Sequence, residues 1–200
     1  MNELIRQVRE KLLSELEVLL IVVVTYLIAF AIVQFGISKI QTAILDDNSS
    51  YFYASLIFLP HGVRLLAAFL LGARSIFPLF VASLAGQWLF FNPEPYAFWA
   101  LLPGCVSCYL AIRLIALTGI QFIDGPINLV TWRQLMLIGF LGAVVNGLGI
   151  MVVYLMNGAS ELSVLPRLFV YILGDTVGAL VLLVGFLIVR RFMKASQNRV

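Results

Sequence analysis

Charged side chains are scarce in this 200-residue chain: 12% of its residues are Asp, Glu, Lys or Arg, whereas 62% are hydrophobic. Soluble globular domains are about half apolar and about a quarter charged. This composition excludes a soluble domain. It also argues against nucleic acid as a partner, because binding would need basic residues gathered on one solvated face. The mean hydropathy of +1.04 predicts that most of the chain lies in lipid.

Histidine and cysteine are also rare, and their counts exclude several kinds of site. His61 is the single histidine, so a haem held by two axial histidines cannot form. The two cysteines, Cys105 and Cys108, lie in an apolar run, where buried cysteines usually act as small apolar side chains. No nucleophile motif, phosphate-binding loop or dinucleotide fingerprint occurs. We therefore expect no catalytic residue, no cofactor and no metal, and a protein that is not an enzyme.

Six apolar runs alternate with short turn-forming stretches, which predicts an all-α, polytopic transmembrane helical bundle of about six spans. At a rise of about 1.5 Å per residue, each run crosses most or all of the hydrocarbon. The predicted spans are 17–38, 51–72, 76–91, 97–118, 133–156 and 167–189. They form one membrane domain over residues 17–190, and a short basic cytoplasmic tail follows at 191–200.

Residues 1–16 mix apolar residues at helical spacing with charged ones. This pattern predicts an amphipathic cytoplasmic lead-in helix lying at the membrane surface. A solvated extension of the first span fits the same pattern. A docking surface for a partner protein is a third interpretation of the segment.

The positions of lysine and arginine predict that both termini are cytoplasmic, because these residues concentrate on the inner side of membrane proteins. With the N-terminus inside, Lys39 and Arg167 fall outside and Arg64 falls within a span. The other basic residues of the chain fall inside: Arg6, Arg9, Lys11, Arg74, Arg113, Arg133, Arg190, Arg191, Lys194 and Arg199. We expect a multi-pass protein of a bacterial inner (plasma) membrane, with the lipid bilayer as its first partner.

Ionisable groups within the predicted spans are the candidate functional residues, because a charge in hydrocarbon costs about 3 kcal/mol or more unless it is paired or hydrated. Arg64 lies in the second span and Asp175 in the sixth. Counted by helix rise, these residues and His61 lie about 12 to 20 Å below the outer surface. We expect Asp175 to pair with Arg64 or His61, and Thr176 and the Gly174 backbone to extend the network.

Other residues complete this candidate polar centre. Pro60 is expected to break the second span, and Asn146 lies near the centre of the fifth among small residues that favour close helix packing. The full set is Pro60, His61, Gly62, Arg64, Asn146, Gly174, Asp175 and Thr176. The set is either a structural ion pair that maintains helix register, or a site for a small polar or anionic ligand or for a proton.

Two stretches of the sequence resemble the type-one membrane-associated sensor family of bacterial integral membrane sensory domains. Residues 60–86 carry the first signature, at Pro60, Gly62, Gly72, Arg74, Pro78, Ala82, Ser83 and Gly86, and the second is Gly174, Asp175 and Gly178. The resemblance implies a sensory module that feeds a histidine kinase, a diguanylate cyclase or a phosphodiesterase. This chain has fewer predicted spans than that family and a short tail after Arg190. The resemblance therefore implies a module that signals to a separate membrane or cytoplasmic protein partner.

Two other functions remain open at this point. The predicted bundle is similar in size and topology to the substrate-capturing S-components of energy-coupling-factor vitamin transporters, which would bind a solute from outside. Alternatively, the chain is a structural subunit of a membrane complex or a homo-oligomer. A kinase or cyclic-nucleotide enzyme as partner would favour sensing, whereas an ATPase with a coupling subunit would favour uptake.

Overall fold

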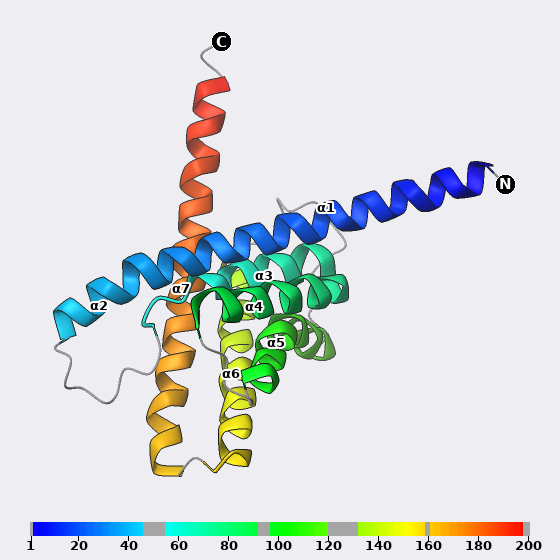
Figure 1. Ribbon diagram of the computed structural model, residues 1–200. Helices are drawn as coiled ribbons and strands as arrows, with labels where there is room; N and C mark the ends of the chain where they lie inside the picture. Colours follow the sequence, from blue (N-terminus) through cyan, green and yellow to red (C-terminus); the bar gives the residue numbers. More distant parts are fainter. Residues whose placement is uncertain (1, 46–54, 92–96, 120–131, 159–160, 198–200) are drawn as a thin grey trace.

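The computed structural model describes residues 2–45, 55–91, 97–119, 132–158 and 161–197, and these form helices without any strand (Figure 1). The all-α prediction is confirmed for this part of the chain. Five helical stretches within it are long and apolar enough to cross a membrane: Arg9–Ile44, Leu59–Phe90, Phe98–Leu117, Trp132–Met156 and Leu165–Met193. The chain is thus built as a multi-pass membrane protein.

A single helical rod opens the chain. Helix α1 (Asn2–Ile32) passes through the π-helical turn η1 (Val33–Ile37) into α2 (Ser38–Leu45). The predicted lead-in helix is not a separate element, because α1 begins at Asn2 and continues without interruption into the apolar run. Figure 1 shows the N-terminal part of α1 extending beyond the other helices. This arrangement agrees with an extension of the first span.

The 32-residue stretch Leu59–Phe90 is a hairpin of two short helices. Helix α3 (Leu59–Leu71) and helix α4 (Ile76–Phe90) are joined by the 3-10 turn η2 (Gly72–Ser75). Gly72 has a φ of +57°, a conformation that a residue without a Cβ adopts at little cost, and the chain reverses there.

Contacts with α1 show that the hairpin is closed. The rings of Phe58, just before α3, and Phe90, at the end of α4, lie 5.9 and 5.2 Å from the ring of Phe30. The turn lies near the middle of α1, because Arg74 in η2 pairs with Glu15. The chain therefore runs along α1 twice, in opposite directions, between Phe58 and Phe90.

The second predicted span, 51–72, begins later than expected in the described residues. Residues 55–58 are not helical, and α3 starts at Leu59. Pro60 consequently lies in the first turn of α3, where a missing backbone N–H breaks no hydrogen bond. The prediction that Pro60 breaks a span is wrong for this reason, since Pro60 begins a helix and does not interrupt one.

Residues 55–58 pack their backbone directly on α7 (Glu161–Gln197). The Phe58 N–H donates to the Gly174 carbonyl at 2.9 Å, and the Leu56 N–H donates to the Gln41 side chain at 2.9 Å. The Ile57 N–H donates to the Ser55 hydroxyl at 3.4 Å. All three amide groups are satisfied, as a non-helical segment at membrane depth requires.

Three further helices complete the bundle. Helices α5 (Ala97–Leu117) and α6 (Trp132–Met156) precede α7, and α6 lies beside α7 in Figure 1. Gly142 of α6 allows α5 to approach closely, because a Cβ there would lie 2.9 Å from Cys108 Sγ. Helix α7 runs unbroken to Gln197, and its C-terminal part extends beyond the other helices (Figure 1).

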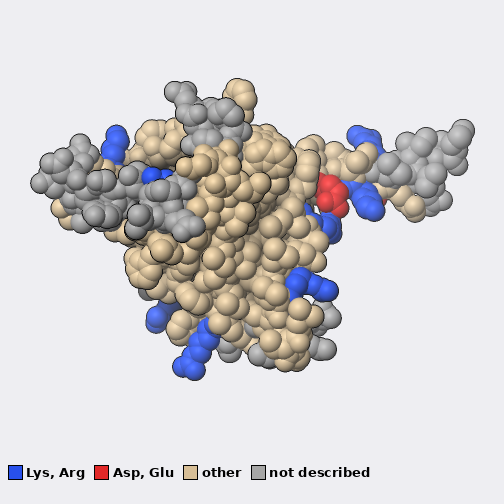
Figure 2. Space-filling view, turned by 90° about the horizontal axis from the view of Figure 1, so that it is seen from below, with Lys and Arg blue, Asp and Glu red and all other residues tan. Residues whose placement is uncertain are grey.

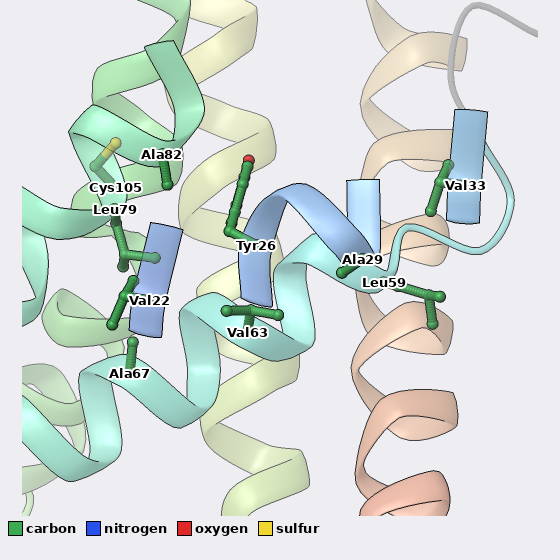
Figure 3. Packing of buried hydrophobic residues seen from close by; sticks show 10 residues of the cluster. All are labelled: Val22, Tyr26, Ala29, Val33, Leu59, Val63, Ala67, Leu79, Ala82 and Cys105. Atoms are coloured by element: carbon green, nitrogen blue, oxygen red, sulfur yellow. The ribbon is translucent and has the colours of Figure 1, made fainter. Parts of the chain in front are cut away.

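The buried side chains of the bundle are mostly apolar, and many large apolar side chains lie on its outside. One buried cluster joins α1, α3, α4 and α5, and Figure 3 shows Tyr26 of α1 within it beside Val63. The face in Figure 2 is mostly uncharged, with Lys and Arg near its margins and on the α1 extension. Large apolar side chains such as Trp88 and Phe169, each 70% exposed, lie on the outside, which suits contact with lipid.

The contact between residues 55–58 and α7 can be tested by adding one methyl group. In Gly178→Ala, the new Cβ would overlap the Phe58 backbone, whereas a Cβ at Gly185 meets nothing within 4 Å. We expect Gly178→Ala to lower the stability of the detergent-solubilised protein by about 1–3 kcal/mol, as overpacking does. Gly185→Ala is the matched control and should be neutral or slightly stabilising. Equal unfolding midpoints for the two variants would contradict this packing.

Candidate functional site

Four polar side chains from three helices are buried at the centre of the bundle. His61 and Arg64 belong to α3, Asn146 to α6 and Asp175 to α7, and none is more than 7% exposed. The sequence predicted that these residues face the protein interior, and the structure places all four there. They divide into two groups with different partners.

The first group surrounds the Asp175 carboxylate. Asn146 Nδ2 donates to Asp175 Oδ2 at 2.6 Å, and His61 Nδ1 lies 3.3 Å from the same oxygen. The other ring nitrogen, His61 Nε2, lies 2.9 Å from the Gly139 carbonyl oxygen. A histidine, an asparagine and a carboxylate from three helices thus form one buried network, here called the Asp175 network.

The Gly139 carbonyl determines where protons lie in this network. A carbonyl oxygen only accepts, so Nε2 must carry the hydrogen. Nδ1 faces the Asp175 carboxylate at 3.3 Å and makes no hydrogen bond among the described residues. The network therefore places two ionisable side chains next to each other in the interior of the bundle.

The second group surrounds Arg64 and is aromatic. Arg64 Nη2 donates to the Tyr26 hydroxyl at 2.9 Å, and the guanidinium carbon lies 5.6 Å from the Tyr26 ring centroid and 5.4 Å from that of Phe58. Gly104 of α5 makes room for the guanidinium, because a Cβ there would lie 2.7 Å from Arg64 Cζ. Cation–π contacts of this kind are worth about 0.5–2 kcal/mol each, so they offset part of the burial cost.

Of the two partners predicted for Asp175, Arg64 or His61, the structure places His61 against the carboxylate. Among the described residues Arg64 forms no ion pair, and Asp175 pairs with His61, which was the other partner considered. Both side chains lie in the interior as expected, but they face different neighbours. Helix rise estimates depth along the membrane normal and carries no information about which side of a helix meets which neighbour.

The remaining candidate residues have packing roles. The Thr176 hydroxyl donates to the Ile172 carbonyl of its own helix at 2.7 Å and does not extend the Asp175 network. The Gly174 carbonyl accepts from Phe58 N–H, outside that network. Gly62 allows α3 to approach α7, because a Cβ there would lie 3.3 Å from the Ala179 Cα. Pro60 is buried in the first turn of α3.

Sequence reasoning missed Tyr26, Phe58 and Gly104 as neighbours of Arg64. Tyr26 is a single phenol in the run LLIVVVTYLIAF, and it is only 1% exposed. Buried tyrosines usually find a hydrogen-bond partner for the hydroxyl. The position of Tyr26 in the middle of a span could therefore have indicated that its hydroxyl bonds a buried polar group such as Arg64.

A smaller aromatic cluster lies at the junction of α6 and α7. The Tyr154 and Tyr171 hydroxyl oxygens are 3.4 Å apart, and the Arg167 guanidinium carbon lies 5.6 Å from the Tyr154 ring centroid. Tyr171 precedes Asp175 by one helical turn on α7. The cluster thus continues the polar character of the α6–α7 seam toward the ends of these helices.

The cysteines do not form a metal centre in the described residues. Cys108 Sγ lies 3.9 Å from His61 Nε2, and Cys105 Sγ lies 3.9 Å from the Ser83 hydroxyl oxygen. No group of three or more His, Cys, Asp or Glu side chains in this part of the chain could hold a metal ion. Comparison with known proteins identifies no relative: no family model, curated protein or solved structure matches the chain.

A double-mutant cycle can separate the two polar groups. We expect a coupling free energy of about 1–3 kcal/mol between Asn146→Leu and Asp175→Leu, because either change alone leaves a buried polar group without its partner. The coupling between Arg64→Leu and Asp175→Leu should be smaller, since these side chains share no bond. The measurement is the unfolding midpoint of each variant in detergent. A larger coupling for the Arg64 cycle would contradict the geometry.

Proposed function

We propose that the protein crosses a bacterial inner membrane six times, with both termini in the cytoplasm. The closed hairpin supports six crossings, because α3 and α4 run along α1 in opposite directions. Helix α3 rises about 20 Å, and the non-helical residues 55–58 precede it along α7. The excess of Lys and Arg on the predicted inner side supports the orientation.

The proposed function is that of a non-enzymatic sensory module that responds to a small ligand and signals to a separate protein partner. The observation that carries it is the Asp175 network, a titratable, fully buried cluster assembled from α3, α6 and α7. Intramembrane ionisable groups are costly and commonly functional. A cluster of ionisable side chains that joins three helices can be arranged in two ways, as a switch requires.

The resemblance to the type-one membrane-associated sensor family supports the same function. Its two signatures, at 60–86 and 174–178, are separated by 87 residues in the sequence. They meet in the bundle where His61 contacts Asp175. Next to this contact, Phe58 bonds Gly174 and Gly62 closely approaches Ala179. The two signatures therefore contribute to one contact between α3 and α7. Such a contact suits a sensory module in which a stimulus changes the packing of these helices.

Helix α7 supplies the proposed route to the partner. It carries Asp175 and continues without a break to Gln197, beyond the rest of the bundle. A change at Asp175 that shifts or rotates α7 would therefore move its basic C-terminal end on the cytoplasmic side. A ligand drives such a change only by the difference in its affinity for the two states.

The six-span topology can be tested with single cysteines in a background where Cys105 and Cys108 are replaced by alanine. With six spans, a cysteine at Ala73 or Thr118 reacts with a membrane-impermeant maleimide only from the cytoplasmic side, and one at Phe91 or Asn157 only from outside. With Leu59–Phe90 as a single span, the positions after it would label from the opposite sides and the C-terminus would lie outside. That second pattern would reject the six-span proposal.

The sensory function can be tested by purifying the tagged protein from its native membrane and identifying what co-isolates. We expect a histidine kinase or a cyclic-dinucleotide enzyme whose activity changes at least several-fold in His61→Gln and Asp175→Asn. Gly185→Ala is the control and should leave that activity unchanged, because its Cβ meets nothing within 4 Å. Co-isolation of an ATPase with a coupling subunit would instead identify a substrate-capturing subunit of an uptake system.

A further inference from the structure

The guanidinium of Arg64 has more hydrogen-bond donors than its surroundings accept. Arg64 is 7% exposed and makes one hydrogen bond in the described part of the chain, from Nη2 to Tyr26. Its Nε is buried without a hydrogen-bond partner there. A guanidinium carries five N–H donors and no acceptor, so this group can bind additional acceptor atoms.

The neighbours of Arg64 increase this excess of donors. Tyr26 accepts from Arg64, and its own hydroxyl hydrogen meets no acceptor among the residues the structure describes. The rest of the surroundings are the two aromatic rings and the Gly104 backbone. Two donors from α1 and α3 thus lie together without a matching acceptor.

The charge of Arg64 is also uncompensated by any bonded group. Among the described residues the carboxylate of Asp175 contacts Asn146 and His61, and it forms no ion pair with Arg64. The two ring contacts of Arg64 supply partial negative charge but no counter-ion. A buried cation with free donors and no counter-ion is the complement of a small anion.

We propose that Arg64 and Tyr26 form a binding site for one small monovalent anion, such as a halide, nitrate or a short carboxylate. Arg64 supplies the charge and Nε–H, and Tyr26 supplies the hydroxyl hydrogen. One positive charge selects a single negative charge, and the enclosing rings and Gly104 limit the size. The site is separate from the Asp175 network, and it deepens the proposed sensory function by naming the class of ligand.

Anion-dependent thermal unfolding tests the site. The purified protein in phosphatidylcholine nanodiscs is moved from sodium gluconate to sodium chloride, nitrate or formate at constant ionic strength. A ligand that binds only the folded state raises the unfolding midpoint, by about 2–4 °C when the anion is several-fold above its dissociation constant. We expect this rise in the wild type, none in Arg64→Gln, and about tenfold weaker anion affinity in Tyr26→Phe.

Arg113→Gln is the matched control, because Arg113 is an exposed arginine on α5 and its loss should leave the anion response intact. The proposal is overturned if the wild type shows no rise relative to gluconate, or if Arg64→Gln retains it. If Arg64→Gln does not fold, a response in Tyr26→Phe equal to that of the wild type overturns the proposal.

A further arm distinguishes a free anion from a lipid phosphate. If phosphatidylglycerol in the nanodisc raises the midpoint through Arg64 and the free anions do not, the small-anion site is rejected in favour of a lipid site. Failure of the anion site leaves the partner test of the Asp175 network unaffected. Conversely, an anion response together with an uptake ATPase as partner would reject the sensory function and retain the site.

Discussion

A direct contact between two backbones, residues 55–58 and helix α7, sets the geometry of the polar centre. It is possible because Gly174 and Gly178 have no Cβ, and the Phe58 N–H bonds the Gly174 carbonyl across it. This bond places the start of α3 next to Asp175, so that His61, three residues after Phe58, lies 3.3 Å from the carboxylate. Any side chain at Gly178 would push α3 outward, and the titratable pair would separate.

The bundle accommodates its two buried bases in different ways. His61 lies between the Gly139 carbonyl and the Asp175 carboxylate, so polar and acidic groups surround it. Arg64 is held by two aromatic faces and one hydroxyl, which leave its charge in place. Two ring contacts and a hydrogen bond are comparable in size with a burial cost of about 3 kcal/mol. Arg64 can therefore remain buried while an anion binds and leaves.

The hairpin of α3 and α4 links this centre to both ends of the bundle. Its turn is tied to α1 through Arg74 and Glu15, and its open end is tied through Phe58 and Phe90 to Phe30. Helix α7 then connects Asp175 to the cytoplasmic end proposed for the chain. A change in protonation or ligand binding at the polar centre would therefore act on α7, which continues to that end. The proposed sensory function needs this arrangement.

The sequence alone determined the solvent and the class of fold, because apolar runs of this length exclude water and a backbone in lipid must satisfy its hydrogen bonds within helices. It also identified His61, Arg64, Asn146 and Asp175 as interior, since each would be costly against lipid. Only the tertiary structure decided that Asp175 meets His61, that Arg64 meets Tyr26, and that α3 starts at Leu59. Periodicity and helix rise give the depth and exposure of residues along one helix. The partners of a side chain depend instead on how the helices rotate and pack against one another. In this bundle, that packing is set by glycines that contact backbone distant in the sequence.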